Sequence, residues 1–73
     1  MLTDIVIKLR EHGIQERWSG EQQHDALEYF LFMYNEHKHE HGTYKYLQGD
    51  KYIDAMKERL SYCWDKTIKY MVK

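Results

Sequence analysis

The sequence predicts an all-α fold, a small three-helix domain with one short N-terminal helix and two long antiparallel helices. Apolar residues recur at spacings of three and four in three segments, the pattern of helices that bury one face. The chain has no proline and only four glycines, so few positions interrupt a helix. Its 73 residues are expected to form one domain spanning 1–73.

The first helix is predicted over about residues 4–12. Thr3 is a candidate N-cap, and Gly13 is a candidate for the residue just past the C-terminus. The apolar side of this helix comprises Leu2, Ile5, Leu9 and His12. The β-branched run at 5–7 makes a strand the competing interpretation.

The second helix is predicted over about residues 20–41. Ser19 and Gln22 match a capping box, in which each side chain binds the backbone N–H of the other residue. Gly42 is expected to end the helix, because glycine adopts the left-handed backbone conformation common at that position.

The third helix is predicted over about residues 50–71, with Asp50 as its candidate N-cap. Its apolar stripe is the cleanest in the chain and comprises Ile53, Met56, Leu60, Cys63, Trp64, Ile68 and Met71. The linker at 43–49 carries two tyrosines and a leucine, so it is expected to pack over one end of the bundle.

The second helix holds more apolar residues than one face can bury in so small a chain, because eight of the nine residues at 26–34 are apolar. Its predicted core face comprises Ala26, Leu27, Phe30, Leu31 and Tyr34. Its predicted polar face comprises Asp25, Glu28, Asn35 and His39. Phe32 falls on that polar face between Tyr29 and Met33, and Tyr62 holds a similar place on the third helix. These last four residues are the predicted partner interface.

The sequence carries no signature of catalysis. It has no Ser-His-Asp spacing, no Gly-rich phosphate loop and no paired-carboxylate pattern. The one cysteine, Cys63, falls in an apolar stripe, where a thiol is normally a small core residue. We therefore assign no catalytic residue, no cofactor and no metal ligand, and the chain is not expected to be an enzyme.

A histidine-rich run closes the second helix. His37 and His41 lie one helical turn apart with Glu40 close by, so a metal shared between them is an alternative, with metal-dependent assembly as its consequence. A solvated helix end whose cations complement the helix dipole is the simpler interpretation.

Charge is distributed unevenly along the chain. The net charge is −1, but residues 1–41 carry −4 and residues 42–73 carry +3. This polarity suits either head-to-tail pairing of two copies or a plain solvated surface. Nucleic-acid binding is the main alternative function, and the residues predicted to carry it on the last helix are Arg59, Lys66, Lys69 and Tyr70.

The function that these patterns favour is a non-enzymatic protein-interaction module. We expect a small accessory regulator or inhibitor that binds a larger protein and self-associates through its second helix, most simply as a homodimer. The single cysteine and the lack of a leader or membrane span predict a cytoplasmic protein with no membrane partner.

Overall fold

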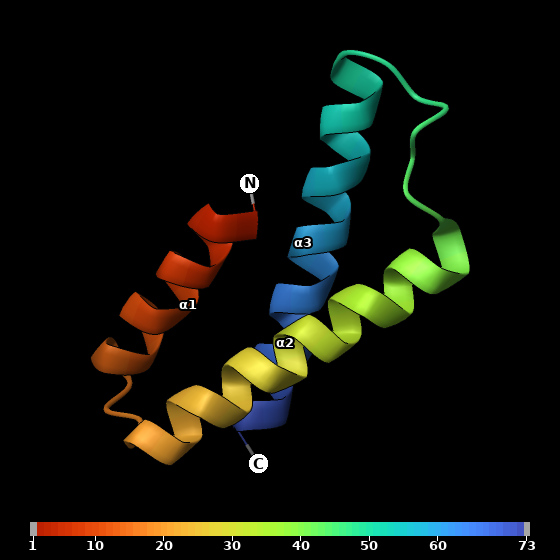
Figure 1. Cartoon of the computed structure of the whole chain (residues 1–73). Helices are drawn as coiled ribbons and strands as arrows, with labels where there is room; N and C mark the ends of the chain where they lie inside the picture. The colour runs from red at the N-terminus through yellow and green to blue at the C-terminus, as the bar shows by residue number, and fades with distance from the viewer. Residues whose placement is uncertain (1, 73) are drawn as a thin grey trace.

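The computed structural model describes residues 2–72 and contains three helices, α1 (Leu2–Gln15), α2 (Gly20–His41) and α3 (Asp50–Met71). In the view of Figure 1 they run down, up and down again, with a short turn joining α1 to α2 and a longer loop joining α2 to α3. The described residues contain no strand, so the predicted all-α class and the order of one short and two long helices are confirmed.

Both ends of α2 are where the sequence predicts them. The Ser19 hydroxyl oxygen accepts a hydrogen bond from the Gln22 backbone N–H at 3.1 Å, and the Ser19 N–H donates to Gln22 Oε1 at 2.8 Å. Gly42 has a φ of 82°, and its N–H donates to the Lys38 carbonyl at 2.7 Å. The capping box and the terminating glycine therefore define the two ends of the helix through local hydrogen bonds.

The predicted ends of α1 are wrong, because Thr3 and Gly13 both lie inside the helix. Gly13 is buried against Trp18, and a Cβ at position 13 would stand only 2.6 Å from Trp18 Cε3. The helix ends later, where Arg17 takes the left-handed conformation with φ of 58°. The Trp18 N–H then donates to the Gly13 carbonyl at 2.9 Å, as in a Schellman motif. Gly13 therefore allows Trp18 to pack closely on α1 and does not end the helix.

The predicted N-cap of α3 is also wrong. Asp50 is the first residue of the helix, and Gly49, with φ of 59°, precedes it without any side-chain capping bond. The acidic Asp50 still lies in the first turn, where it complements the positive end of the helix dipole.

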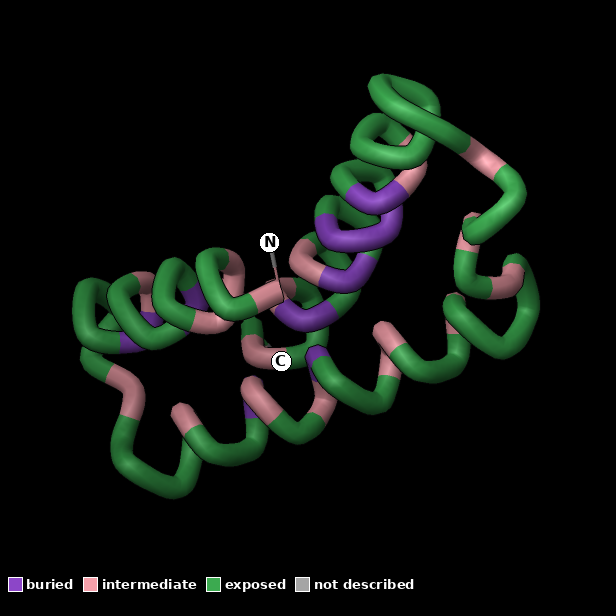
Figure 2. The backbone as a smooth tube through the Cα atoms, turned by 45° about the horizontal axis from the view of Figure 1, so that its top comes forward, coloured by how far each residue is buried: buried purple, intermediate pink, exposed green. Residues whose placement is uncertain are grey.

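The core lies where α2 packs against the layer formed by α1 and α3, and Figure 2 shows the buried positions of α3 turned toward α2. Its central cluster comprises Leu9, Ala26, Phe30, Leu60 and Cys63. The predicted core face of α2 is confirmed at Ala26 and Phe30, whereas Leu27 and Tyr34 are only half-buried and Leu31 is exposed. The four residues predicted for the polar face of α2 are all exposed.

The buried side of α3 also contains two polar residues that do not belong to its predicted apolar stripe. Arg59 and Thr67 are both fully buried, and the Thr67 hydroxyl donates to the Cys63 carbonyl one turn earlier at 2.7 Å. Trp64, Ile68 and Met71 pack at the edge of the core as predicted, whereas Ile53 is exposed.

The molecule is extended and exposes more surface than its mass predicts. Its radius of gyration is 13.0 Å, against about 11 Å for a typical domain of this length. Its accessible surface is 5578 Å², against about 4,900 Å² for a typical monomer of 9.0 kDa, an excess of about 700 Å². No described helix is long and apolar enough to cross a membrane.

Candidate protein-interaction surface

A groove of about 510 Å³ separates α1 from α3. We call it the α1–α3 groove, and it is lined by Asp4, Ile5, Lys8, Lys57, Leu60, Ser61 and Trp64. A smaller cavity of about 200 Å³ lies on the other side of α1, against α2. Because α1 is short and is anchored mainly through the buried Leu9, it leaves space along both of its neighbours.

The α1–α3 groove combines an apolar floor with a lysine on each wall. Ile5, Leu60 and Trp64 supply the apolar surface, Lys8 stands on α1 and Lys57 stands on α3. Both lysines are exposed, and no ion pair among the described residues involves either of them. Asp4 also lines the α1 wall, one turn before Lys8, so the lining carries two cations and one anion. The groove is therefore suited to an apolar group that carries negative charge next to the two lysines.

The Trp64 wall of the groove is held in place by a ring contact. The His12 ring meets the Trp64 ring edge-on at 5.6 Å between centroids, and it meets the Trp18 ring in the same manner at 5.5 Å. His12 thus links α1, the following turn and α3, and these edge-to-face contacts stabilise the shape of the groove.

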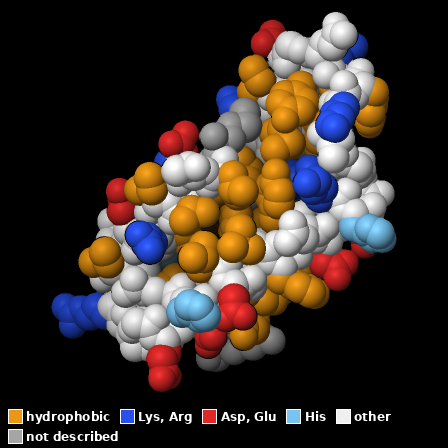
Figure 3. All heavy atoms as spheres, viewed as in Figure 1, with side chains coloured by type: hydrophobic (Ala, Val, Ile, Leu, Met, Phe, Trp, Pro, Cys, Tyr) orange, Lys and Arg blue, Asp and Glu red, His pale blue; other side chains and the backbone are white. Residues whose placement is uncertain are grey.

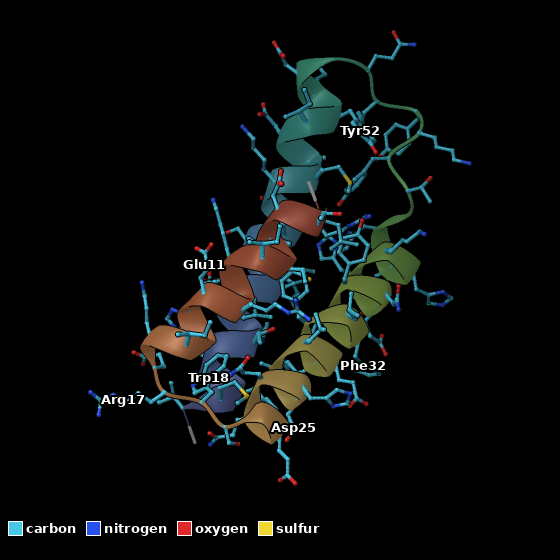
Figure 4. All side chains as sticks on the ribbon, turned by 60° about the vertical axis from the view of Figure 1, so that its left-hand side comes forward. Glu11, Arg17, Trp18, Asp25, Phe32 and Tyr52 are labelled. Carbon is cyan, nitrogen blue, oxygen red and sulfur yellow. The ribbon has the colours of Figure 1, made fainter. Side chains whose placement is uncertain are left out.

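A second feature lies on the outer side of α2. The Phe32 side chain is 58% exposed and points away from α1 and α3 (Figure 4). We define the Phe32 face as the residues Glu28, Phe32, Asn35, Glu36 and His39, the last four of which line a shallow depression. Glu28 and Glu36 stand one turn before and one turn after Phe32, and Glu28 also contacts the exposed His24 at 3.1 Å. The face is therefore an aromatic ring flanked by two carboxylates.

The structure does not bring the four predicted interface residues into one patch. Tyr29 stacks on Tyr70 at 4.1 Å between ring centroids, and Met33 packs against the core, so both join helices within the chain. Tyr62 is exposed but lies beside the His37 ring on α3's flank. Phe32 alone projects freely from the outer side of α2.

Arg59, one of the four residues predicted to bind nucleic acid, is buried inside the fold and is not available to a ligand. A guanidinium in that position does not reach a phosphate on a ligand. Lys66 and Lys69 are exposed, with the Lys66 ammonium 5.6 Å from the centre of the Tyr62 ring, while Tyr70 is committed to its stack with α2. Two lysines remain from the predicted set, which is a weak phosphate-binding surface.

Arg59 instead closes the C-terminal end of α2. Its Nε donates to His37 Nδ1 at 2.9 Å, and its Nη2 donates to the Gly42 carbonyl oxygen. The guanidinium carbon lies 4.2 Å from the centre of the Tyr44 ring and 5.6 Å from that of Tyr34. The buried cation is therefore stabilised by the negative end of the α2 dipole and by aromatic faces. Among residues 2–72, Arg59 forms no ion pair with a carboxylate.

The hydrogen bond from Arg59 also determines the chemistry of His37. Because Nδ1 accepts from a permanently charged guanidinium, the neutral ring carries its proton on Nε2, and neither nitrogen has a lone pair left for a metal. The His37 and His41 rings do lie close, at 4.3 Å between centroids. Sharing a metal would nevertheless require His37 to give up its bond to Arg59.

The pKa of His37 is lowered, first by burial and then by the positive charges of His41 and Arg59, while Glu40 and Glu58 act in the opposite direction. A lowered pKa means that the unfolded chain takes up a proton at a higher pH than the folded chain. We therefore expect the free energy of unfolding to fall as the pH drops through about 6.5 and to level off below the lowered pKa of His37.

Urea unfolding followed by circular dichroism between pH 7.5 and pH 5.5 measures this dependence. Histidines dominate the change in the free energy of unfolding over this pH range. His37→Gln keeps an oxygen that can accept from Arg59 but does not titrate, so it should flatten the pH dependence. His24→Gln, at an exposed site on the same helix, should leave the His37 contribution intact. An unchanged slope in His37→Gln would show that another group is responsible.

Burial raises the pKa of the Cys63 thiol to about 11, partly offset by the nearby Arg59 charge. The reactive thiolate is therefore scarce at neutral pH, and the sulfur is inaccessible. We expect iodoacetamide to alkylate the folded chain at least about 100-fold more slowly than the urea-unfolded chain, since the shift from 9.0 to about 11 alone removes that much thiolate. Equal rates would mean that Cys63 is exposed in solution.

Comparison with known proteins gives no relative for this chain: no protein-family model matches, and neither do any curated proteins or solved structures.

Proposed function

We propose that this protein is a non-enzymatic interaction module, a small accessory regulator or inhibitor that covers a site on a larger protein and also self-associates. Its mechanism is steric, since a helical surface occupies a site that another molecule would use. The buried, weakly acidic thiol of Cys63 is consistent with action in the cytoplasm, where thiols stay reduced.

The observation that carries this proposal is the excess of exposed surface. About 700 Å² beyond the expectation for a monomer is close to the roughly 800 Å² that each partner contributes to a standard protein interface. Hydrophobic side chains gather in the middle of the face shown in Figure 3, between α1 and α2 and over α3. The large hydrophobic side chains that are exposed among residues 2–72 are Ile7, Ile14, Leu31, Phe32, Tyr46, Tyr52, Ile53, Tyr62, Tyr70 and Val72.

These exposed residues outnumber the buried hydrophobic ones, of which Ala26 and Cys63 are small. A second molecule that covers even part of this surface adds about 25 cal/mol for each Å² of apolar area buried, before the cost of association. For a domain with so thin a core, such a partner contributes a substantial share of the stability.

Affinity capture with the full chain as bait tests the interaction module. We expect a protein from the source cell to be retained in stoichiometric amount and to bind again when both components are purified. Phe32→Ala should weaken that binding while the far-ultraviolet circular dichroism stays helical, and Tyr46→Ala, an exposed aromatic change in the loop, serves as the matched control. Failure to capture or reconstitute any partner, together with a strictly monomeric chain, would refute the proposal.

A further inference from the structure

We infer that the Phe32 face of one copy docks into the α1–α3 groove of a second copy, so that the chain associates head to tail. This inference deepens the proposed function, on which it rests, by naming the occupant of the groove. Each copy contributes one groove and one protruding face, and the two features have no lining residue in common.

The two surfaces are complementary in charge. The groove offers the ammonium groups of Lys8 and Lys57, one on each wall, against the single carboxylate of Asp4 on the α1 wall. The Phe32 face offers two carboxylates, Glu28 and Glu36, one on each side of the ring. The two carboxylates are eight residues apart, or about 12 Å along a helix, while packed helices lie about 8–10 Å apart. An α2 helix that crosses the groove therefore places one carboxylate against each wall.

The two surfaces are also complementary in apolar area. The Phe32 ring is 58% exposed in the free chain, and the groove presents Ile5, Leu60 and Trp64 beneath the lysines. Its volume of about 510 Å³ is more than a single aromatic side chain needs, which leaves room for part of the helix that carries the ring. An aromatic anchor in a pocket with a charged rim is the arrangement that dominates binding at protein interfaces.

A symmetric pairing of two α2 helices fits the same residues less well. If two Phe32 faces met antiparallel about a two-fold axis, Glu28 of one copy would oppose Glu36 of the other at both ends of the contact. Like charges held opposite one another weaken binding. The same carboxylates are favourable against the two lysines of the groove.

Head-to-tail contact makes a distinctive prediction, because each copy keeps one free groove and one free face. Association should extend beyond a dimer as concentration rises, unless the copies close into a ring. Because the contact consists of two different surfaces, one variant can lack the Phe32 face and another can lack the α1–α3 groove.

The test is complementation, measured by sedimentation velocity on the full chain. Phe32→Glu removes the protruding face, and Lys8→Glu combined with Lys57→Glu removes the groove. Each variant alone should remain monomeric at concentrations where the wild type associates, with apparent affinity at least about 10-fold weaker. A mixture of the two should form a 1:1 dimer and nothing larger, since only one intact face and one intact groove are present.

The control is Lys45→Glu combined with Lys69→Glu, which changes the net charge equally at exposed positions away from the groove. It should associate like the wild type. Circular dichroism of all variants verifies that the helices remain folded, so that loss of association is not loss of structure.

Three results would overturn the head-to-tail contact. The first is a mixture that stays monomeric, the second is a Lys8 and Lys57 variant that associates like the wild type, and the third is a wild type that remains a monomer at all concentrations. Loss of association in Phe32→Glu alone, with no effect of the lysine changes, indicates symmetric α2 pairing and leaves the proposed interaction module standing. A monomeric wild type that also captures no partner refutes both.

Discussion

Replacing Arg59 with alanine is expected to lower the free energy of unfolding by about 2–4 kcal/mol. The change removes the cation that closes α2 and leaves the Gly42 carbonyl and His37 Nδ1 without their donor. It also opens a cavity beneath the Tyr44 ring, where the guanidinium packs in the wild type. Urea unfolding at a chain concentration low enough to avoid association measures the loss.

Lys66→Ala on the same helix is the control for Arg59→Ala, because it removes an exposed cation and should change stability by no more than about 0.5 kcal/mol. The stability of a chain of this length is roughly 4–11 kcal/mol, so Arg59→Ala removes a large fraction of it. A cost below about 1 kcal/mol would mean that Arg59 is solvated and that α2 ends without it.

Replacing Phe30 with alanine should cost about 3–5 kcal/mol, whereas the same change at Phe32 should cost less than about 0.5 kcal/mol. The two residues lie two positions apart on one helix, but Phe30 is completely buried in the core cluster and Phe32 is 58% exposed. The chain therefore supplies its own matched pair, with the same residue type, helix and substitution.

Urea unfolding of Phe30→Ala and Phe32→Ala at low chain concentration gives both values directly. Measured at high concentration, Phe32→Ala should lose the stabilisation that association adds, and Phe30→Ala should remain the less stable of the two. Equal costs at low concentration would place both rings in the core and would remove the basis for an interaction surface on α2.

Local signals in the sequence were enough to predict both ends of α2. Ser19 and Gln22 bond to each other, and Gly42 bonds back into the helix, so both ends depend on residues no more than four positions apart. The predicted C-terminus of α1 was wrong because Gly13 is required for close packing against the Trp18 ring, which follows the helix. Tertiary packing there overrides the usual role of a glycine.

The site was harder to predict, because it depends on contacts between segments far apart in the chain. Arg59 bonds to His37 and Gly42, 22 and 17 residues away, and no periodicity reveals that pairing. Its position did carry one signal, since residue 59 falls three residues after Met56 and four before Cys63, within the apolar stripe. A charged residue at such a position is a candidate for burial.

The exposure of Phe32 was predictable, but the α1–α3 groove was not. Helical spacing alone places Phe32 among the polar residues of α2, and the structure confirms its exposure. The groove depends on how far α1 stands from α3, and Ile5 and Trp64 belong to segments separated by almost the whole chain. Their juxtaposition follows from the fold and not from any local pattern.

The central claim is that this chain exposes more surface than it can stably leave in water, so that a second molecule covers part of it. Sedimentation equilibrium of the wild-type chain, from about 10 μM to about 1 mM, tests this most directly. We predict a weight-average mass that rises above 9.0 kDa with concentration and falls back in Phe32→Glu. A mass of 9.0 kDa at every concentration would contradict the claim.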